Sequence, residues 1–243
     1  MDKQKNKTDF IRNIRSILSD DRKPHESVSE QYKAIVNKNS NKKRISDITD
    51  FLNNNIESLA IELLKNAKSS GWQTKKISNI SECSNYINKI ILEVNAKSIV
   101  TSNDKFILDL NIYNENVKIN NIEKKNTTKD KDNTRNLIIN ADIGITTVDY
   151  AIADTGTCVL ISKKELSRLV SLLPPIYIAI VNKKQILENL DNLFIYQKHK
   201  FEQEDYTSSI SLISGPSRSA DIQSELITGV HGPGNVHMIL IDY

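Results

Sequence analysis

Residues 73–101 have the sequence QTKKISNISECSNYINKIILEVNAKSIVT. This segment predicts a strand at Gln73–Ile77, a helix over Glu82–Val94 and a second strand at Ser98–Thr101, because helical apolar spacing is confined to its middle part. A strand, a helix and another strand of these lengths are typical of two parallel strands joined by a helical crossover. We therefore predict an α/β fold whose parallel or mixed sheet is covered by helices.

A long amphipathic helix is predicted immediately upstream. Apolar residues recur every three or four positions over Ile48–Leu64, and Gly71 is a natural C-terminal breaker. Residues 9–20 predict a second, short amphipathic helix that is followed by a polar stretch. We therefore divide the chain into an N-terminal helical extension at 1–45 and an α/β domain at 46–243.

Further elements are predicted downstream. Residues 120–136, NNIEKKNTTKDKDNTRN, are charged and without periodicity, which predicts an exposed loop or a disordered insertion. Six of the seven glycines and four of the five prolines lie between Gly144 and Gly234, so loops that carry sites are expected there. The pattern predicts strands at 137–140, 157–162, 176–181, 210–213 and 236–241, and helices at 146–153, 183–193 and 220–228.

Charge, cysteine content and hydropathy limit the function classes. Residues 1–143 hold 25 Lys and Arg against 19 Asp and Glu, whereas 144–243 hold 8 against 11, so we expect no nucleic-acid site in the Gly- and Pro-rich part. Cys83 and Cys158 are the only cysteines, and one chain therefore lacks the four thiolates of an iron–sulfur cluster. The lack of a long apolar run or secretory signal predicts a cytoplasmic protein with no membrane span.

Asp154 is the first candidate for chemistry. In Ala153-Asp154-Thr155-Gly156-Thr157 its carboxylate stands beside two hydroxyl groups, at a tight turn that Gly156 permits. One interpretation makes Asp154 a nucleophile or base. In the other, Asp154, Thr155 and Thr157 satisfy backbone groups, as Asx and Thr turns do. The residues alone leave both interpretations open.

A second candidate is an anion site formed by Gly215, Ser217, Arg218 and Ser219. The surrounding segment, Ser214–Ile222, follows a predicted strand and is expected to open the helix at 220–228. Small residues, free N–H groups and a guanidinium at a helix N-terminus suit a carboxylate or phosphate. The alternative is a well-capped helix in which Arg218 pairs with Asp221.

Three glycines surround His231 and predict close backbone approach to a ligand or to a neighbouring loop. His231 and His237 have no Cys or carboxylate at matching spacing, so no metal site is expected. The full anion-binding set that we expect joins the four residues above to Thr155, Gly156, Thr157, His231 and Gly232.

Five blocks together resemble the lactate utilization protein C family, within the LUD domain. Their order and spacing are similar to the family pattern over residues 137–243. Asp154 stands where many relatives carry Glu, and Gln223 stands where an acidic residue often follows. The blocks are Gly144-Ile-Thr, Ala153-Asp-Thr-Gly-Thr157, Arg168-Leu-Val-Ser-Leu-Leu-Pro-Pro175, Ser214-Gly-Pro-Ser-Arg-Ser-Ala-Asp-Ile222 and Gly229-Val-His-Gly-Pro233.

The resemblance implies a fold similar to that of ribose-5-phosphate isomerase, glucosamine-6-phosphate deaminase and the CoA transferases. It also implies a role in L-lactate oxidation to pyruvate alongside iron–sulfur partner proteins. We expect no redox cofactor on this chain, which would then be a non-redox component that organises the complex or helps to bind the substrate carboxylate through Arg218 and the amides of Ser217 and Ser219. One alternative is a stand-alone CoA-transferase-like or sugar-phosphate-type enzyme that uses Asp154, and another is a vestigial pocket on a protein that acts through its surfaces.

Overall fold

The computed structural model describes residues 38–112, 115–122, 128–162, 167–202, 209–220 and 226–242. The chain divides into two compact units, residues 1–42 and 43–243, and the architecture below is that of the second. The helix predicted at 9–20 lies outside the described residues. The division into an extension at 1–45 and a domain at 46–243 stays a prediction.

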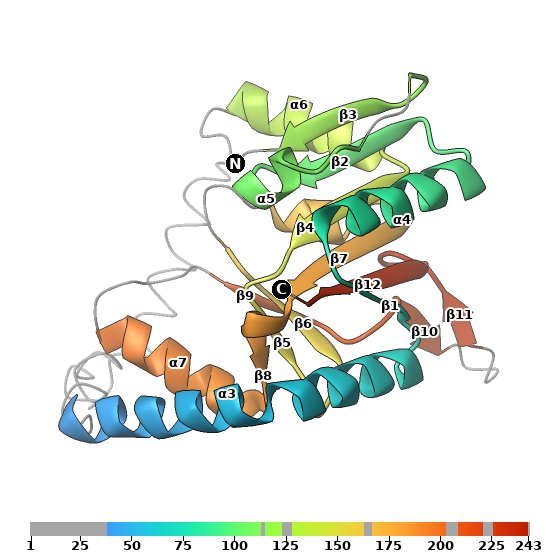
Figure 1. Cartoon of the computed structure of the whole chain (residues 1–243). Coiled ribbons are helices and arrows are strands. Elements are labelled where there is room, and N and C mark those ends of the chain that lie inside the picture. The colour runs from blue at the N-terminus through green and yellow to red at the C-terminus, as the bar shows by residue number, and fades with distance from the viewer. Residues whose placement is uncertain are drawn as a thin grey trace, which may run out of the picture. The chain divides into compact units, whose positions relative to one another are not determined.

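A parallel sheet forms the centre of the second unit (Figure 1). Every pair of neighbouring strands in it is parallel, and Met238 lies between Thr74 and Ala179 in the register. This arrangement confirms the predicted α/β fold. The described strands follow the order β1 (Gln73–Ile77), β12 (Asn235–Ile241), β7 (Ile176–Asn182), β4 (Ile143–Thr147), β2 (Ser98–Ser102) and β3 (Lys118–Ile122).

Strand β7 explains why the central strands are continuous apolar runs. Tyr177, Ala179 and Val181 are buried in one core cluster, whereas Ile178 and Ile180 are buried in another. Because successive side chains of a strand point to opposite faces, both faces of the sheet are covered. Parallel sheets are covered in this way by the elements that connect their strands.

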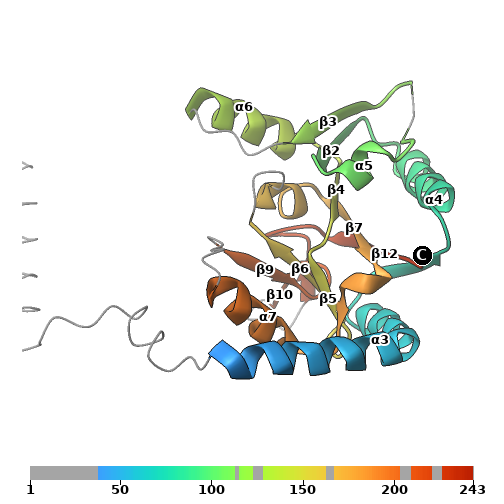
Figure 2. The ribbon, with the colours of Figure 1, turned by 60° about the vertical axis from the view of Figure 1, so that its left-hand side comes forward.

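Helix α3 (Lys38–Ser69) and a second sheet cover one face, and α4 (Ile80–Glu93) and α5 (Lys105–Leu108) cover the other (Figure 1 and Figure 2). The second sheet has the order β8 (Ile186–Leu187), β5 (Tyr150–Ile152), β6 (Thr157–Ile161) and β9 (Ile210–Ile213). The remaining described elements are α6 (Thr128–Ile139), the 3-10 turns η1 (Arg168–Ser171) and η2 (Lys183–Gln185), helix α7 (Leu190–Glu202), and strands β10 (Arg218–Ala220) and β11 (Leu226–Thr228).

The predictions for residues 120–140 are wrong. Strand β3 extends to Ile122, and the charged stretch from Thr128 forms helix α6 instead of a loop. The strand predicted at 137–140 is mainly the last turn of that helix. Ile138 is fully buried there, whereas Leu137 and Ile139 are 38% and 49% exposed, which is the one-sided burial of a helix lying on a core.

Three predicted helices are also wrong. Residues 146–153 contain the end of β4 and strand β5, and 220–228 contain the described ends of the β10–β11 hairpin. Residues 183–193 contain η2 and β8, and α7 begins only at Leu190. Strands β5, β8, β10 and β11 have two or three residues each, too few to establish an alternating pattern that competes with a helical one. Among the described helices, none has the length and apolar character needed to cross a membrane.

Candidate functional site

The Thr155–Thr157 and Ser214–Arg218 segments meet at the C-terminal end of α3. The hydroxyl of Thr157 lies 2.7 Å from that of Ser214 and donates to Thr155 Oγ1 at 2.8 Å. Strand β6 begins at Thr157, and strand β9 ends at Ile213, directly before Ser214. The two strands are neighbours in the second sheet. The fold therefore brings together two sequence blocks that lie about 60 residues apart, in agreement with long-range pairing of antiparallel strands.

Gly156 allows the turn between β5 and β6 to approach α3. Its φ is +62°, and a Cβ at this position would lie 2.2 Å from the backbone nitrogen of Ala67. Asn66 Nδ2 donates to the carbonyl oxygens of Ala153 at 2.9 Å and Asp154 at 3.0 Å. The turn is thus held against the helix by close packing and by hydrogen bonds.

Arg218 contacts the same helix end. Its Nη2 donates to the carbonyl oxygen of Ser70 at 3.0 Å. Gly215 has a φ of +112°, and a Cβ there would lie 2.2 Å from that same oxygen. A guanidinium beside terminal carbonyls satisfies an unpaired acceptor and interacts favourably with the negative end of the helix dipole. The described contact of Arg218 is therefore structural.

The prediction that a helix begins at residue 220 is wrong. Arg218–Ala220 is strand β10, which pairs with β11 so that Ser219 faces Ile227. The Ser217 amide already donates to Pro233 O at 2.8 Å. The expected anion site instead borders the C-terminal end of α3, where partial negative charge disfavours an anion. Anion binding by these residues stays a prediction, without the helix N-terminus that motivated it.

The other predicted site residues have different surroundings. Asp154 is exposed, and its backbone N–H donates to Glu188 O at 3.1 Å. His231 is exposed, and a Cβ on Gly232 would lie 3.3 Å from Ser217 Cβ. In the part of the chain that the structure describes, no group of three His, Cys, Asp or Glu side chains is suited to a metal ion.

His237, unlike His231, is buried. Its Nδ1 lies 3.2 Å from the hydroxyl of Tyr86, and Nε2 has no hydrogen-bond partner within the described residues. Burial lowers the pKa of His237 from 6.5 to about 4, although the negative charge of Glu93 acts in the opposite direction. The imidazole is therefore neutral near pH 7 and belongs to the packing between β12 and α4.

A cavity of about 410 Å³ lies at the carboxyl ends of the central strands. Its lining includes Thr147 at the end of β4, Asn182 at the end of β7 and Ile241 at the end of β12. From β2 the chain continues to β3 on one side, whereas from β4 it returns towards β7 on the other. Ligands of open α/β sheets bind at carboxyl ends where connections diverge in this way.

Asp104 is held rigidly at this cavity. Its Oδ2 accepts hydrogen bonds from Ser102 Oγ at 2.6 Å and Thr147 Oγ1 at 3.0 Å, and its Oδ1 accepts from Ile107 N at 3.1 Å. These bonds cap α5 and join the ends of β2 and β4. Lys105 and Lys184, both exposed, add two ammonium groups to the lining.

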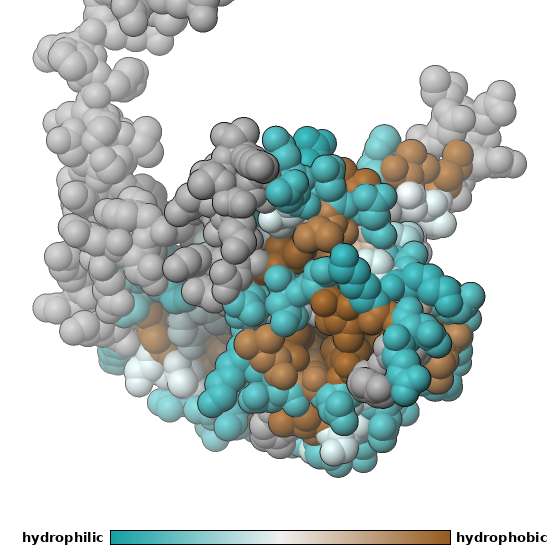
Figure 3. Space-filling view, turned by 90° about the horizontal axis from the view of Figure 1, so that it is seen from above, coloured by the Kyte–Doolittle hydropathy of each residue, from teal (hydrophilic) through white to brown (hydrophobic). Residues whose placement is uncertain are grey.

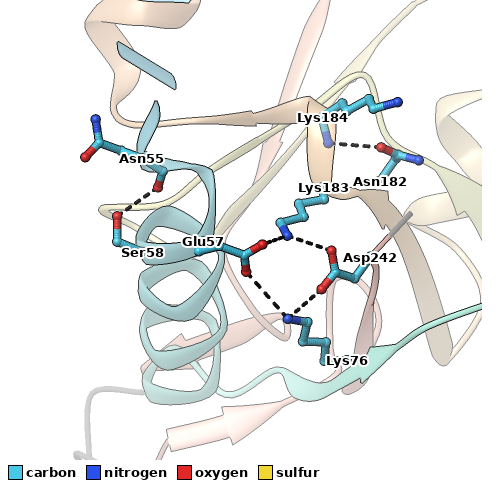
Figure 4. Close-up of polar contacts among 8 residues, drawn as sticks. All are labelled: Asn55, Glu57, Ser58, Lys76, Asn182, Lys183, Lys184 and Asp242. Atoms are coloured by element: carbon cyan, nitrogen blue, oxygen red, sulfur yellow. Dashed lines mark hydrogen bonds and ion pairs between the residues drawn. The ribbon is translucent and has the colours of Figure 1, made fainter. Parts of the chain in front are cut away.

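Four charged side chains join the neighbouring strand ends to α3 (Figure 4). Lys183 Nζ contacts Glu57 and lies 2.6 Å from Asp242 Oδ1, and Lys76 Nζ lies 2.7 Å from Asp242 Oδ2. The pKa of Asp242 is lowered by the hydrogen bonds it accepts, most by that from Lys183 and less by that from Lys76. The pKa of Lys183 is raised by the hydrogen bonds it donates, most by that to Asp242 and less by that to Glu57. The two shifts favour the charged forms of Asp242 and Lys183, and their contacts fix the segment that leads to Lys184.

A second cavity, of about 450 Å³, is lined by Ile56 of α3, Tyr150 of β5 and Tyr196 of α7. Neither described cavity is lined by Asp154, Arg218 or the other residues predicted from the sequence blocks. The sequence interpretation missed the first cavity although a signal was present. Polar residues follow each apolar strand, and the carboxyl ends of parallel strands share one edge of a sheet.

Three comparisons place the chain among known proteins. The family model described as LUD domain matches residues 61–241. The lactate utilization protein C of Oceanobacillus iheyensis is 28% identical over 252 residues, covering 98% of both chains. That of Halalkalibacterium halodurans is 35% identical over 161 residues, covering 64% of this chain and 67% of the relative.

The structural comparison concerns the fold alone. A DUF162 family protein from Deinococcus radiodurans matches with a TM-score of 0.53 and 16% identity, over 76% of this chain and 98% of that chain. Its likeness agrees with the central parallel sheet described above. With the family match over residues 61–241, the comparisons show that this chain belongs to the LUD domain family, in the lactate utilization protein C group.

Proposed function

We propose that the protein is a non-redox component of bacterial L-lactate utilization, acting with iron–sulfur partner proteins in the oxidation of L-lactate to pyruvate. The observation that carries this proposal is the similarity to lactate utilization protein C of Oceanobacillus iheyensis along 98% of both chains. A similarity of this extent includes the sheet and the loops around it. It therefore supports a shared role more strongly than a likeness of fold does.

The positions of the two cysteines support the proposal that iron–sulfur clusters are held by partner proteins. Cys83 is buried among α4 side chains on one face of the central sheet, and Cys158 is buried in the core on the other. Burial raises the pKa of the Cys83 thiol to about 12 and also raises that of Cys158. Metal ligation requires a thiolate, so neither side chain is suited to hold an iron–sulfur cluster.

Exposed apolar side chains support an interaction with another protein. Viewed from above, apolar surface lies among polar residues on the face that includes β3 and α6 (Figure 3). Ile119 of β3 is 36% exposed and Ile139 of α6 is 49% exposed. Within the described residues β3 is an edge strand of the sheet. Apolar groups beside an unpaired strand edge are favourable contact surfaces for a partner.

No observation favours the stand-alone enzyme that would use Asp154 as nucleophile or base. The carboxyl group is at an exposed turn, and the described contacts of Asp154 are made by its backbone N–H and carbonyl oxygen. Covalent catalysis requires a nucleophile placed where substrate is held and water is excluded. The turn offers neither of these conditions among the described residues.

Deletion of the gene in its host tests the proposed function. Loss of growth on L-lactate, with growth on pyruvate retained, is the expected phenotype because the step lies before pyruvate. The wild-type gene should restore growth, and so should the Asp154→Asn variant. Normal growth of the deletion strain on L-lactate would contradict the proposal. Failure of Asp154→Asn alone, with normal protein levels, would support the Asp154 enzyme instead.

A further inference from the structure

We propose that the cavity at the carboxyl ends of β2, β4 and β7 binds a small 2-hydroxycarboxylate. The cavity has a volume of about 410 Å³, and ligand sites commonly occupy roughly 300–1,000 Å³. The ligand class follows from the groups that line it. The choice of a 2-hydroxycarboxylate among small hydroxycarboxylates, and of L-lactate as the natural ligand, rests on the proposed function.

Two lysines make the cavity suitable for an anion. Lys105 and Lys184 line it, and neither ammonium forms an ion pair within the described residues. Asp104 is the single carboxylate among the lining residues described, and its two oxygens accept three hydrogen bonds from the protein. The remaining positive charge attracts a carboxylate.

The neighbouring lysine is not available for this purpose. Lys183 is engaged by Glu57 and Asp242, whereas Lys184 points away from that cluster (Figure 4). The capping box of η2 explains the difference, because Asn182 Oδ1 accepts from the Lys184 amide at 2.9 Å and fixes the turn. Of these two successive residues, Lys183 thus serves the structural cluster and Lys184 the cavity, and both also border the second cavity.

Asn182 and Thr147 provide the polar groups that complement a carboxylate and a hydroxyl. Asn182 uses its side-chain oxygen within η2, and its NH₂ makes no hydrogen bond within the described residues, so it can donate to a carboxylate. The Thr147 hydroxyl donates a hydrogen bond to Asp104 Oδ2 at 3.0 Å. Its oxygen is left as an acceptor, which pairs with a ligand hydroxyl.

The apolar part of the lining limits the rest of the ligand. Phe106, Ile180 and Ile241 line the same cavity. A short hydrocarbon chain is complementary to these side chains, whereas a charged group placed against them would lose its hydration without gaining a partner. A carboxylate, a hydroxyl and a short apolar chain together describe a small hydroxycarboxylate, and the 2-hydroxycarboxylates are the members of this class that the proposed function requires.

Titration calorimetry on the purified full chain tests this site with L-lactate, propionate and lactamide. L-lactate should bind, and propionate, without the hydroxyl, and lactamide, without the carboxylate, should each bind about tenfold more weakly. Lys184→Gln and Thr147→Val should weaken L-lactate binding by a similar factor. The control is Lys65→Gln, since Lys65 is exposed on α3 and lines neither described cavity.

Several results would overturn the site. The first is that L-lactate does not bind to the wild type, and the second is that lactamide binds as tightly as L-lactate. The third is an unchanged affinity for L-lactate in a Lys105→Gln/Lys184→Gln variant whose melting temperature equals that of the wild type. Growth on L-lactate distinguishes this failure from failure of the proposed function. If the deletion strain fails to grow on L-lactate but the purified protein binds no lactate, the proposed site is refuted and the proposed function is not. If the protein binds lactate but the deletion strain grows normally on L-lactate, the proposed function is refuted and the proposed site is not.

Discussion

Replacing Gly156 with alanine tests whether the Asp-Thr-Gly-Thr turn acts through its packing against α3. At a φ of +62° an alanine costs roughly 1–2 kcal/mol. The new Cβ would lie 2.2 Å from the nitrogen and 2.5 Å from the Cα of Ala67, so the helix backbone itself must move. Overpacking of this kind adds roughly 1–3 kcal/mol. We therefore expect a loss of about 3 kcal/mol in the free energy of unfolding.

Urea unfolding followed by tryptophan fluorescence measures this loss. Trp72, the single tryptophan, is 2% exposed and follows the end of α3, with its ring centroid 6.1 Å from that of Tyr177. In a thermal scan the expected loss corresponds to a decrease of about 6–12 °C. Asp154→Asn is the matched control and should change stability by less than about 0.5 kcal/mol, because its side chain is exposed. Wild-type stability of Gly156→Ala would refute the packing role.

Three further changes test the interior and the charged cluster. Tyr177→Phe removes the hydroxyl that lies 2.8 Å from Thr146 Oγ1, and a loss of about 1–2 kcal/mol is expected in urea unfolding; no loss would contradict the buried hydrogen bond. Lys183→Met should cost about 1–2 kcal/mol, less than a fully buried pair because Asp242 is 27% exposed, and high salt should reduce the difference from wild type. The unfolded state binds a proton on His237 below pH 6.5 and the folded state only below about 4, so stability should fall as the pH drops through this window, by up to about 3 kcal/mol. The pH dependence of the free energy of unfolding is compared between the wild type and His237→Gln. An equal dependence in the two proteins would show that His237 does not cause the loss of stability.

The strands of the central sheet were the most predictable elements. Gln73–Ile77 is a strand as expected, and 176–181 and 236–241 differ from β7 and β12 by one residue each. Burial on both faces makes such strands continuous apolar runs, and this signal is local in the sequence. Residues 146–153 and 220–228 were misassigned because very short strands depend on partners elsewhere in the chain.

The candidate site could be predicted only in part. The sequence indicated a tight turn at Gly156, which has a positive φ, whereas Gly215, which also has a positive φ, was assigned to an anion site. It did not reveal that their close neighbour is the end of α3, about 90 residues from Gly156 and further from Gly215. The cavity residues Asp104 and Asn182 come from different strand ends, so their proximity depends on strand order, which one sequence does not specify.

Affinity purification from the host tests the assignment to lactate oxidation most directly. The tagged full chain is purified from cells grown on L-lactate, and the eluate is assayed for iron–sulfur absorbance and for lactate-dependent reduction of a dye. We expect cluster-containing partners and activity that requires L-lactate, with neither in an eluate from an untagged strain. A colourless single protein without activity, at a yield that matches its cellular level, would contradict a role as a component of an iron–sulfur lactate-oxidising system.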